Sequence, residues 1–334
     1  DGGAWRKRTS HTSWYNEGAS ATRGARKEFP AVAVIVVEGS AITIYDGDDP
    51  EMPLWMQFIS GSGQMKIFNR PEYWTNSSVF ALNGIICATN SAGAAESTLV
   101  LNYVSDSVRL YPISGYPTYG GDYSLGISGR ANSSGVFKTI SQLIAGDEAF
   151  DVAMTVLPNA PIDDATGLPI PTIAVATGHG VSVIRDNGNI VSDTSIYGRP
   201  YLKQIQFKGE RLTGLVHQTG NTGDGVLFIE PLGQIPFPEG TDTRYPFFAS
   251  SDSALSLDAV DTRGSHQIAV ASESVIAGGN NGLAIIEENK DSPTNGMLAH
   301  ISKDFNTGYL HGDKIKGAYL ADTDDTNITG SELL

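Results

Sequence analysis

The chain has 334 residues, with 38 glycines, 16 prolines and a single cysteine, and its formal net charge is −15. It contains no run of about 18 apolar residues, which argues against a membrane-spanning helix. The acidic balance argues against nucleic-acid binding, because that affinity comes from neutralising phosphates with Lys and Arg.

Residues 1–30 differ from the rest, with six basic side chains against three acidic ones and two tryptophans, Trp5 and Trp14. This composition predicts a basic arm that docks on another subunit or domain. The alternative is a segment that closes a ring by joining the last strand. We expect one β domain over residues 31–322, and residues 323–334 to begin a linker to a C-terminal module outside this chain.

One pattern recurs along the chain: an apolar run, a Gly-containing turn, and a second run of alternating polarity. The copies are residues 31–46, 84–104, 173–191, 212–230 and 268–289. Runs of these two kinds are typical of strands buried on both faces and on one face. A hairpin of this kind cannot bury its own faces, so copies of it must stack.

The first runs centre near Val34, Ile86, Val175, Leu215 and Val270. They are separated by roughly 40 to 90 residues, whereas propeller blades recur about every 40 to 50. A degenerate unit over GVFKTISQLI and DVAMTVL would fill the widest gap, and residues 297–322 would add a blade or complete the ring. We predict an all-β fold, a β-propeller of six blades, with five or seven blades as alternatives. The competing architecture is a pair of β-sandwiches.

Carboxylates gather in the stretch DGDDPE, which contains Asp46, Asp48 and Asp49. Oxygen-rich loops of this sort hold Ca²⁺, although the EF-hand pattern is absent. Asp and Gly also form turns without any ligand, and we weigh that interpretation above a calcium site. No other cofactor is expected. Cys87 and Trp55 lie in apolar runs and are expected in the core.

Several aromatic residues lie instead in polar or Gly- and Pro-rich surroundings, where exposed rings stack on sugars or anchor protein interfaces. The candidate ligand-binding residues are Trp74, Tyr116, Tyr119 and Tyr123. A rigid loop packed by its own tyrosines is an equally good interpretation of residues 111–123.

Signatures of catalysis are missing from the sequence. It has no nucleophile elbow, no P-loop, no His-Glu-x-x-His and no sialidase Asp-box, and its six histidines lie far apart. We therefore favour a non-enzymatic protein and assign no catalytic residue. A polysaccharide-degrading enzyme with its site in a channel or rim cleft is the alternative.

Long blocks of the chain resemble tail-fibre or minor structural proteins of marine tailed phages. The blocks are WRKRTSHTSWYNE, RGARKEFPAVAVIV, TIYDGDDPEMPLWM, DVAMTVLPNAPIDDATGLPIPTIAVAT and GYLHGDKIKGAYLADTDDTNITGSEL. The resemblance implies a virion component that acts outside the host cell. Its expected partners are other tail proteins and host surface polysaccharide, with a homotrimer by analogy with other fibres. The resemblance assigns no functional residues to this chain.

Overall fold

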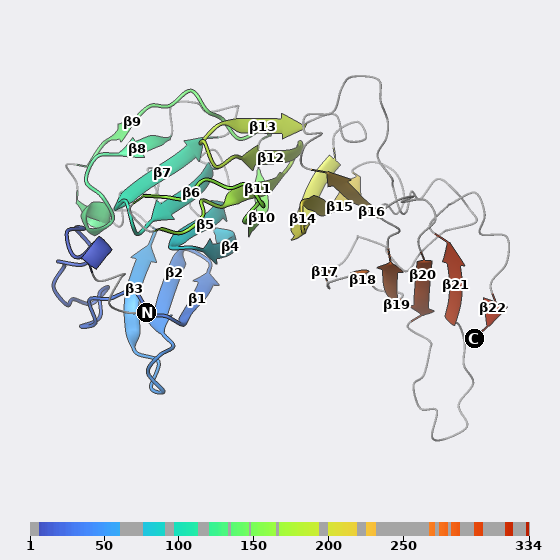
Figure 1. The fold of residues 1–334 in the computed structure, drawn as a ribbon, viewed down its shortest axis with the longest axis horizontal. Helices are drawn as coiled ribbons and strands as arrows, with labels where there is room; N and C mark the ends of the chain where they lie inside the picture. Colours follow the sequence, from blue (N-terminus) through green and yellow to red (C-terminus); the bar gives the residue numbers. More distant parts are fainter. Residues whose placement is uncertain are drawn as a thin grey trace. The chain divides into compact units, whose positions relative to one another are not determined.

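The computed structural model is all-β, as the sequence predicts. It describes residues 7–60, 76–90, 97–112, 120–132, 135–146, 148–164, 167–193, 200–218, 225–231, 267–270, 274–279, 282–287, 297–302, 318–322 and 332–333. The chain divides into two compact units, residues 1–194 and 195–334 (Figure 1). This division differs from the single domain expected over residues 31–322.

The described strands of the first unit form three antiparallel sheets, and in each sheet the strands pair in sequence order. The first sheet contains β1 (Ala33–Glu38), β2 (Ala41–Asp46) and β3 (Leu54–Ile59). The second contains β4 (Asn76–Leu82), β5 (Ile85–Asn90), β6 (Ser97–Asn102), β7 (Ser107–Pro112), β8 (Gly121–Tyr123) and β9 (Phe137–Lys138). The third contains β10 (Ala149–Thr155), β11 (Thr172–Thr177), β12 (Gly180–Ile184) and β13 (Ile190–Asp193). A short 3₁₀ helix, η5 (Ser128–Ala131), follows β8.

The second unit contains two sheets of the same kind among its described residues. The fourth sheet has β14 (Pro200–Lys208), β15 (Arg211–Gln218) and β16 (Gly225–Pro231). The fifth has β17 (Gln267–Val270), β18 (Ser274–Gly279), β19 (Gly282–Glu287), β20 (Met297–Ser302), β21 (Ala318–Asp322) and β22 (Glu332–Leu333).

Residues 173–191 show how the sequence pattern becomes a sheet. β11 and β12 form a tight hairpin in which Thr177 pairs with Gly180, and Gly180 has a φ of +118°. At the next turn Gly188, with φ +80°, donates its N–H to the Arg185 carbonyl at 2.8 Å. Glycine adopts these positive φ values without a Cβ clash, so the two turns lie where the sequence predicts them.

The first strands of successive sheets lie side by side within each unit: β1 with β4, β4 with β10, and β14 with β17. Side chains bond across these junctions. Ser78 Oγ donates to Asp151 Oδ1 at 2.6 Å. The side-chain amide of Gln206 hydrogen-bonds the backbone of β17 through both its nitrogen and its oxygen. Antiparallel meanders with adjacent first strands are the arrangement of propeller blades. The fold class is therefore confirmed, and the blade number stays a prediction.

Three stretches are partitioned differently from the prediction. Phe137–Lys138 is a short edge strand of the second sheet, and the first five residues of DVAMTVL lie in β10, so no separate blade fills that gap among the described residues. Residues 268–289 form three strands rather than two. β20 and β21 extend the fifth sheet instead of beginning another. Strand periodicity alone does not say which sheet a strand joins.

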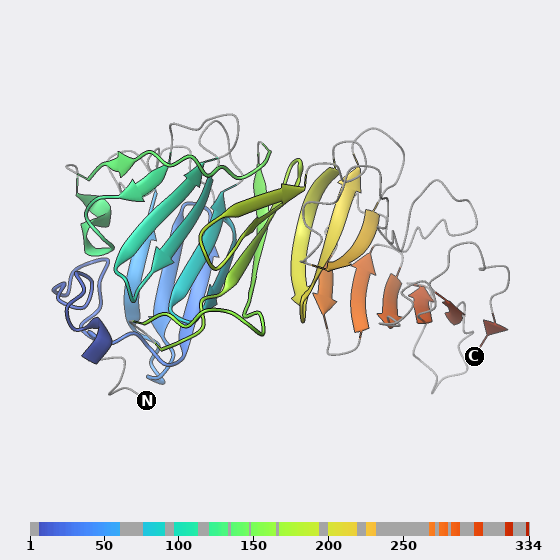
Figure 2. The same cartoon turned by 45° about the horizontal axis from the view of Figure 1, so that its top comes forward.

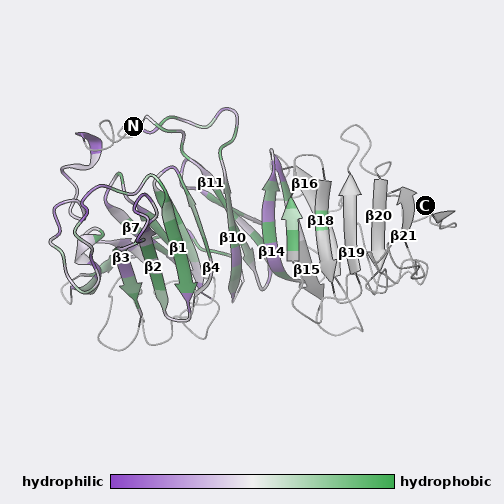
Figure 3. Cartoon of the chain, turned by 90° about the horizontal axis from the view of Figure 1, so that it is seen from below, coloured by the Kyte–Doolittle hydropathy of each residue, from purple (hydrophilic) through white to green (hydrophobic). Residues whose placement is uncertain are grey.

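The core of the first unit lies between its sheets. One cluster joins the first and second sheets around Ile42, Phe58 and Leu99, and a second joins the second and third around Val175. Figure 2 shows strands of the second sheet lying across those of the first, and Figure 3 shows the hydrophobic character of β1 and β2. Sheets that stack in this way bury apolar side chains that a lone hairpin would expose.

The predicted core residues Trp55 and Cys87 are fully buried, and burial raises the pKa of the Cys87 thiol. The most buried strands, such as β5, β11 and β12, lie inside their sheets, whereas β1 with Val34 is half-buried at a sheet edge. A second strand has a hydrogen-bonded neighbour on each side, whereas a first strand has one only on one side.

The N-terminal segment, residues 7–30, packs on the first sheet and is not a detached arm. Gly24 donates its N–H to Trp55 O at 3.0 Å, and Gln57 donates to Thr22 O at 2.9 Å. The described part of this segment therefore adds backbone pairing at the outer edge of β3. These hydrogen bonds to the open edge of the sheet hold the N-terminal segment in place.

In the described residues no helix is long and apolar enough to cross a membrane.

Candidate functional site

Two arginines are buried where the N-terminal segment meets η5. Arg23 and Arg130 are 1% and 2% exposed, and they share one carboxylate, Glu17. Arg130 Nη1 lies 2.8 Å from Glu17 Oε2, and Arg23 Nε lies 3.9 Å from the same oxygen. Two cations against one anion leave this buried cluster with a formal charge of +1, which is costly in a protein interior.

Backbone carbonyls offset part of that cost. Arg23 donates from Nη1 to Trp55 O at 2.9 Å and from Nη2 to Lys27 O at 3.3 Å. Arg130 donates from Nη2 to Thr22 O at 3.4 Å. Burial still lowers the pKa of Arg23, and the nearby Arg130 guanidinium lowers it further. Because the usual pKa of arginine is far above neutrality, the Arg23 side chain remains charged.

Aromatic rings enclose this cluster. The Arg23 guanidinium lies 4.6 Å from the centre of the Trp55 ring, and Trp14 and Tyr103 pack against Trp55 with ring centres 5.7 and 5.5 Å away. Trp14 Nε1 donates to Tyr103 O at 2.6 Å. Burial raises the pKa of the Tyr103 hydroxyl. Both arginines are almost fully buried and bonded to Glu17 and to backbone carbonyls, so we assign the cluster a structural role: it fastens residues 7–30 to the first two sheets.

The loop between β2 and β3, residues 46–53, is exposed at its tip and is held by ion pairs and backbone hydrogen bonds. Arg26 binds two carboxylates at its base, with Nη1 at 2.6 Å from Asp46 Oδ1 and Nη2 at 2.8 Å from Asp48 Oδ2. Asp48 also accepts the backbone N–H groups of Ala31 and Val32 at 2.8 and 2.9 Å. These bonds tie the loop to residues 26–32, the segment that precedes β1.

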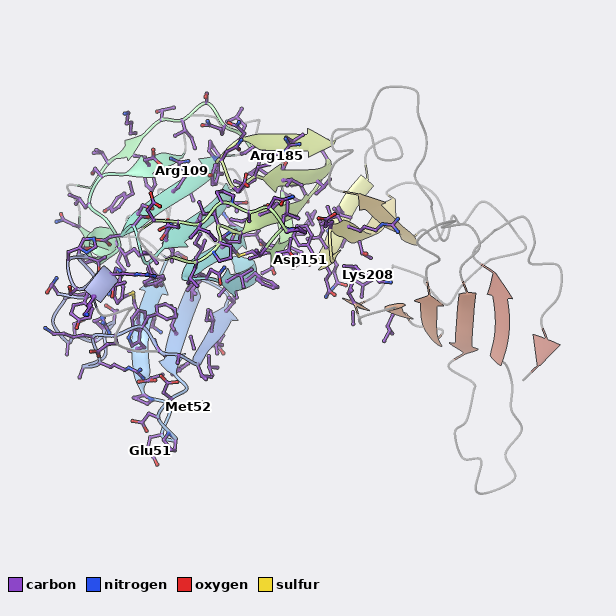
Figure 4. All side chains as sticks on the ribbon, viewed as in Figure 1. Glu51, Met52, Arg109, Asp151, Arg185 and Lys208 are labelled. Carbon is purple, nitrogen blue, oxygen red and sulfur yellow. The ribbon has the colours of Figure 1, made fainter. Side chains whose placement is uncertain are left out.

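The tip of this loop exposes apolar side chains. Met52 is 48% exposed and has a φ of +43°, a conformation that costs a residue with a Cβ roughly 1–3 kcal/mol. Val32, beside the loop, is 57% exposed. Figure 4 shows Glu51 and Met52 at the end of the hairpin, pointing away from the sheets. The loop is therefore held in one shape while its tip remains free to contact another molecule.

The predicted metal ligands Asp46, Asp48 and Asp49 form this loop. Asp46 and Asp48 bind Arg26, and Asp49 Oδ1 accepts the Glu51 N–H at 3.0 Å. No group of three or more His, Cys, Asp or Glu side chains in the described part of the chain is placed to hold a metal ion. The geometry fits the turn interpretation, in which the carboxylates bond backbone and arginine donors.

Of the predicted ligand-binding aromatics, Trp74, Tyr116 and Tyr119 lie outside the described residues. Tyr123 lies within them, and it is buried at 6% exposure rather than presented to a ligand. Its hydroxyl donates to Gly129 O at 2.7 Å, and its ring packs on Phe137. Burial raises its pKa. The expectation for Tyr123 was wrong because its hydroxyl bonds a carbonyl of η5 and its ring packs on Phe137, contacts that local polarity does not reveal.

A half-exposed ion pair on the second sheet was also not predicted from the sequence. Arg109 on β7 is held in a fork by both carboxylate oxygens of Asp122 on β8. The hydrogen bonds that Arg109 donates to Asp122 raise the pKa of Arg109. Residues 13 apart give no motif, and only the pairing of β7 with β8 brings them together. Because its fork is already occupied, Arg109 serves to join two strands.

The Asp48 carboxyl gives the loop a measurable pH dependence. Hydrogen bonds from Ala31 and Val32, and then from Arg26, lower the pKa of Asp48 below its ordinary value of 3.8. A carboxyl whose pKa is lowered in the folded state stabilises the fold at pH values above its ordinary pKa. That stabilisation is lost as the pH falls through the lowered pKa. We expect the amide shifts of Ala31 and Val32 to titrate in an NMR series with a midpoint below 3.8. Asp48→Asn should abolish this titration, and a midpoint at or above 3.8 would contradict the assignment.

No family model and no curated protein matches the chain in sequence. Among solved structures, it is similar to Hsv2p of Kluyveromyces lactis, with 10% identity and a TM-score of 0.35 over 82% of this chain and 70% of that one. It is also similar to the Malassezia sympodialis allergen Mala s 1, with 10% identity and a TM-score of 0.38 over 88% and 84%. It is similar as well to PorZ of Porphyromonas gingivalis, with 10% identity and a TM-score of 0.33 over 88% of this chain and 36% of that one. At such TM-scores these likenesses carry no argument about function.

Proposed function

We propose that this chain is a structural and receptor-binding module of a phage tail, which presents rigid loops to a host surface and catalyses no reaction. The observation that carries the proposal is the 46–53 loop, in which Arg26 and Asp48 fix the backbone while Met52 stays exposed. A loop held in its bound shape loses less conformational entropy on binding, which favours affinity.

Two further points support this proposal. The sequence blocks that resemble marine phage tail proteins include this loop, in TIYDGDDPEMPLWM. In addition, the charged side chains described above bind one another or the backbone: Arg23 and Arg130 share Glu17, and Arg109 binds Asp122. A catalytic acid or base needs a proton-transfer partner on a substrate, and these groups are engaged in holding strands together.

The proposed ligand is host surface polysaccharide. Trp74, Tyr116 and Tyr119 are the proposed stacking residues, and Met52 of the 46–53 loop is the proposed apolar contact. A single sugar–aromatic contact contributes about 1 kcal/mol by analogy with aromatic pairs. One copy alone would therefore bind weakly, and several copies on a fibre would raise the effective affinity.

The test is binding of purified host surface polysaccharide and of host cells to the full chain, immobilised in many copies. Met52→Gly removes the exposed side chain and keeps the positive φ, so we expect binding to fall about tenfold, which corresponds to about 1.4 kcal/mol. Ile162→Ala, at a side chain that is 57% exposed on another part of the unit, is the matched control.

Each outcome separates the alternatives. Equal binding by Met52→Gly and the unchanged chain would remove the loop from the proposal. Sustained release of reducing ends from the polysaccharide would replace the proposal with the polysaccharide-degrading enzyme. Binding to neither probe would leave a spacer between other tail modules.

A further inference from the structure

The tip of the 46–53 loop contains the one Asp–Pro peptide bond in the sequence, Asp49–Pro50. Asp49, Pro50 and Glu51 are all exposed, and the hairpin end that carries them points away from the sheets (Figure 4). The bond lies between β2 and β3, so its cleavage would divide the first sheet into two covalent pieces.

An Asp–Pro bond has two chemical features that favour its own cleavage. The aspartic acid carboxyl can close a five-membered ring on its own backbone carbonyl carbon, as carboxyl nucleophiles do in covalent catalysis. The proline nitrogen belongs to a tertiary amide and carries no hydrogen. It therefore accepts a proton more readily than an ordinary amide nitrogen and leaves as a secondary amine.

The structure adds polarisation of the carbonyl that would be attacked. Met52 donates its backbone N–H to Asp49 O at 2.9 Å. A donor fixed on a carbonyl oxygen stabilises the negative charge that develops there in a tetrahedral intermediate. The Asp49 carboxyl is itself held over the turn, since its Oδ1 accepts the Glu51 N–H at 3.0 Å. Met52, at φ +43°, is held in a strained backbone conformation that cleavage would release.

We propose that Asp49–Pro50 is a self-scission site that operates in acid. The protonated Asp49 carboxyl attacks its backbone carbonyl carbon, the C–N bond to Pro50 breaks, and the carboxyl proton passes to the proline nitrogen. Water then opens the cyclic anhydride and leaves Asp49 as a C-terminus. The net change is the addition of one water molecule, and no other reactant is required.

The surrounding charges keep the loop folded while this happens. The groups that face Asp49 are Asp48 and Glu51 on the loop and, at its base, Asp46 with Arg26. Backbone and Arg26 hydrogen bonds lower the pKa of Asp48, so its bonds to the preceding segment persist in mild acid.

The two products should stay together after cleavage. Residues 1–49 contribute Trp14 to the core and bond β3 through Gly24 and through the whole length of β2. Scission would free the loop ends without dissociating the unit, and the loop would lose the fixed shape described above. The proposal does not depend on what the loop binds.

The experiment is incubation of the full chain at about pH 3 and about pH 7, followed by denaturing mass spectrometry and native size exclusion. We expect fragments 1–49 and 50–334 only in acid, eluting together. Asp49→Asn and Pro50→Ala should lose both fragments, while Glu38→Gln, an exposed carboxylate on the same sheet, should cleave as the unchanged chain does.

A synthetic peptide of residues 44–55 at the same pH distinguishes the folded loop from the bare dipeptide. We expect the folded chain to cleave faster than the peptide, because Met52 polarises the carbonyl only in the folded turn. Equal or faster cleavage of the peptide, or no cleavage of the folded chain, would overturn the proposal.

Discussion

Replacing Trp14 with alanine is expected to lower the free energy of unfolding of the first unit by about 3–5 kcal/mol, the usual cost of truncating a fully buried tryptophan. Trp14 is 0% exposed and packs against Trp55 and Tyr103. The substitution also removes the indole hydrogen bond to Tyr103 O. Both losses fall on the contact that holds the N-terminal segment to the sheets.

Urea unfolding followed by tryptophan fluorescence measures this effect in the first unit, because all four tryptophans precede residue 195. Val32→Ala, at a side chain that is 57% exposed, is the control and should change stability by less than about 0.5 kcal/mol.

Deletion of residues 1–28 should unfold the unit for the same reason. A stable deletion variant would restore the interpretation of this segment as a detachable arm.

Glu17→Gln is expected to destabilise the first unit by about 3 kcal/mol, at the lower end of the range for breaking a buried ion pair. Glutamine keeps the shape and a hydrogen-bond acceptor, but it leaves Arg23 and Arg130 buried with no counter-charge. We place the value at the lower end because the Glu17 side chain is 19% exposed, and solvent screens part of the repulsion.

A double-mutant cycle checks the mechanism. Arg130→Met alone removes the ion pair, and Glu17→Gln in that background should cost much less than about 3 kcal/mol, since only Arg23 then lacks its counter-ion. The same unfolding measurement serves for all four proteins. Equal costs of Glu17→Gln in both backgrounds would show that its carboxylate does not act through Arg130.

Local sequence was sufficient to predict the hairpins. The glycines at 180 and 188 fix the β11–β12–β13 turns, because positive φ is costly for other residues. Apolar runs placed Trp55 and Cys87 in the core, since a strand flanked by two sheets has no polar face. The turn interpretation of Asp46 and Asp48 also follows from residue type, because Asp bonds nearby backbone N–H groups.

Tertiary structure decided what depends on distant partners. Arg23 and Arg130 are 107 residues apart and look like ordinary surface charges, yet each is buried once Glu17 and the rings around Trp55 enclose it. Tyr123 looked exposed and is buried, with its hydroxyl bonded to the Gly129 carbonyl of η5. The docking place of residues 7–30 was likewise set by pairing between segments far apart in the chain, Gly24 with Trp55 and Thr22 with Gln57. Burial and sheet membership are properties of the assembled layers, whereas a sequence window reports only its own periodicity.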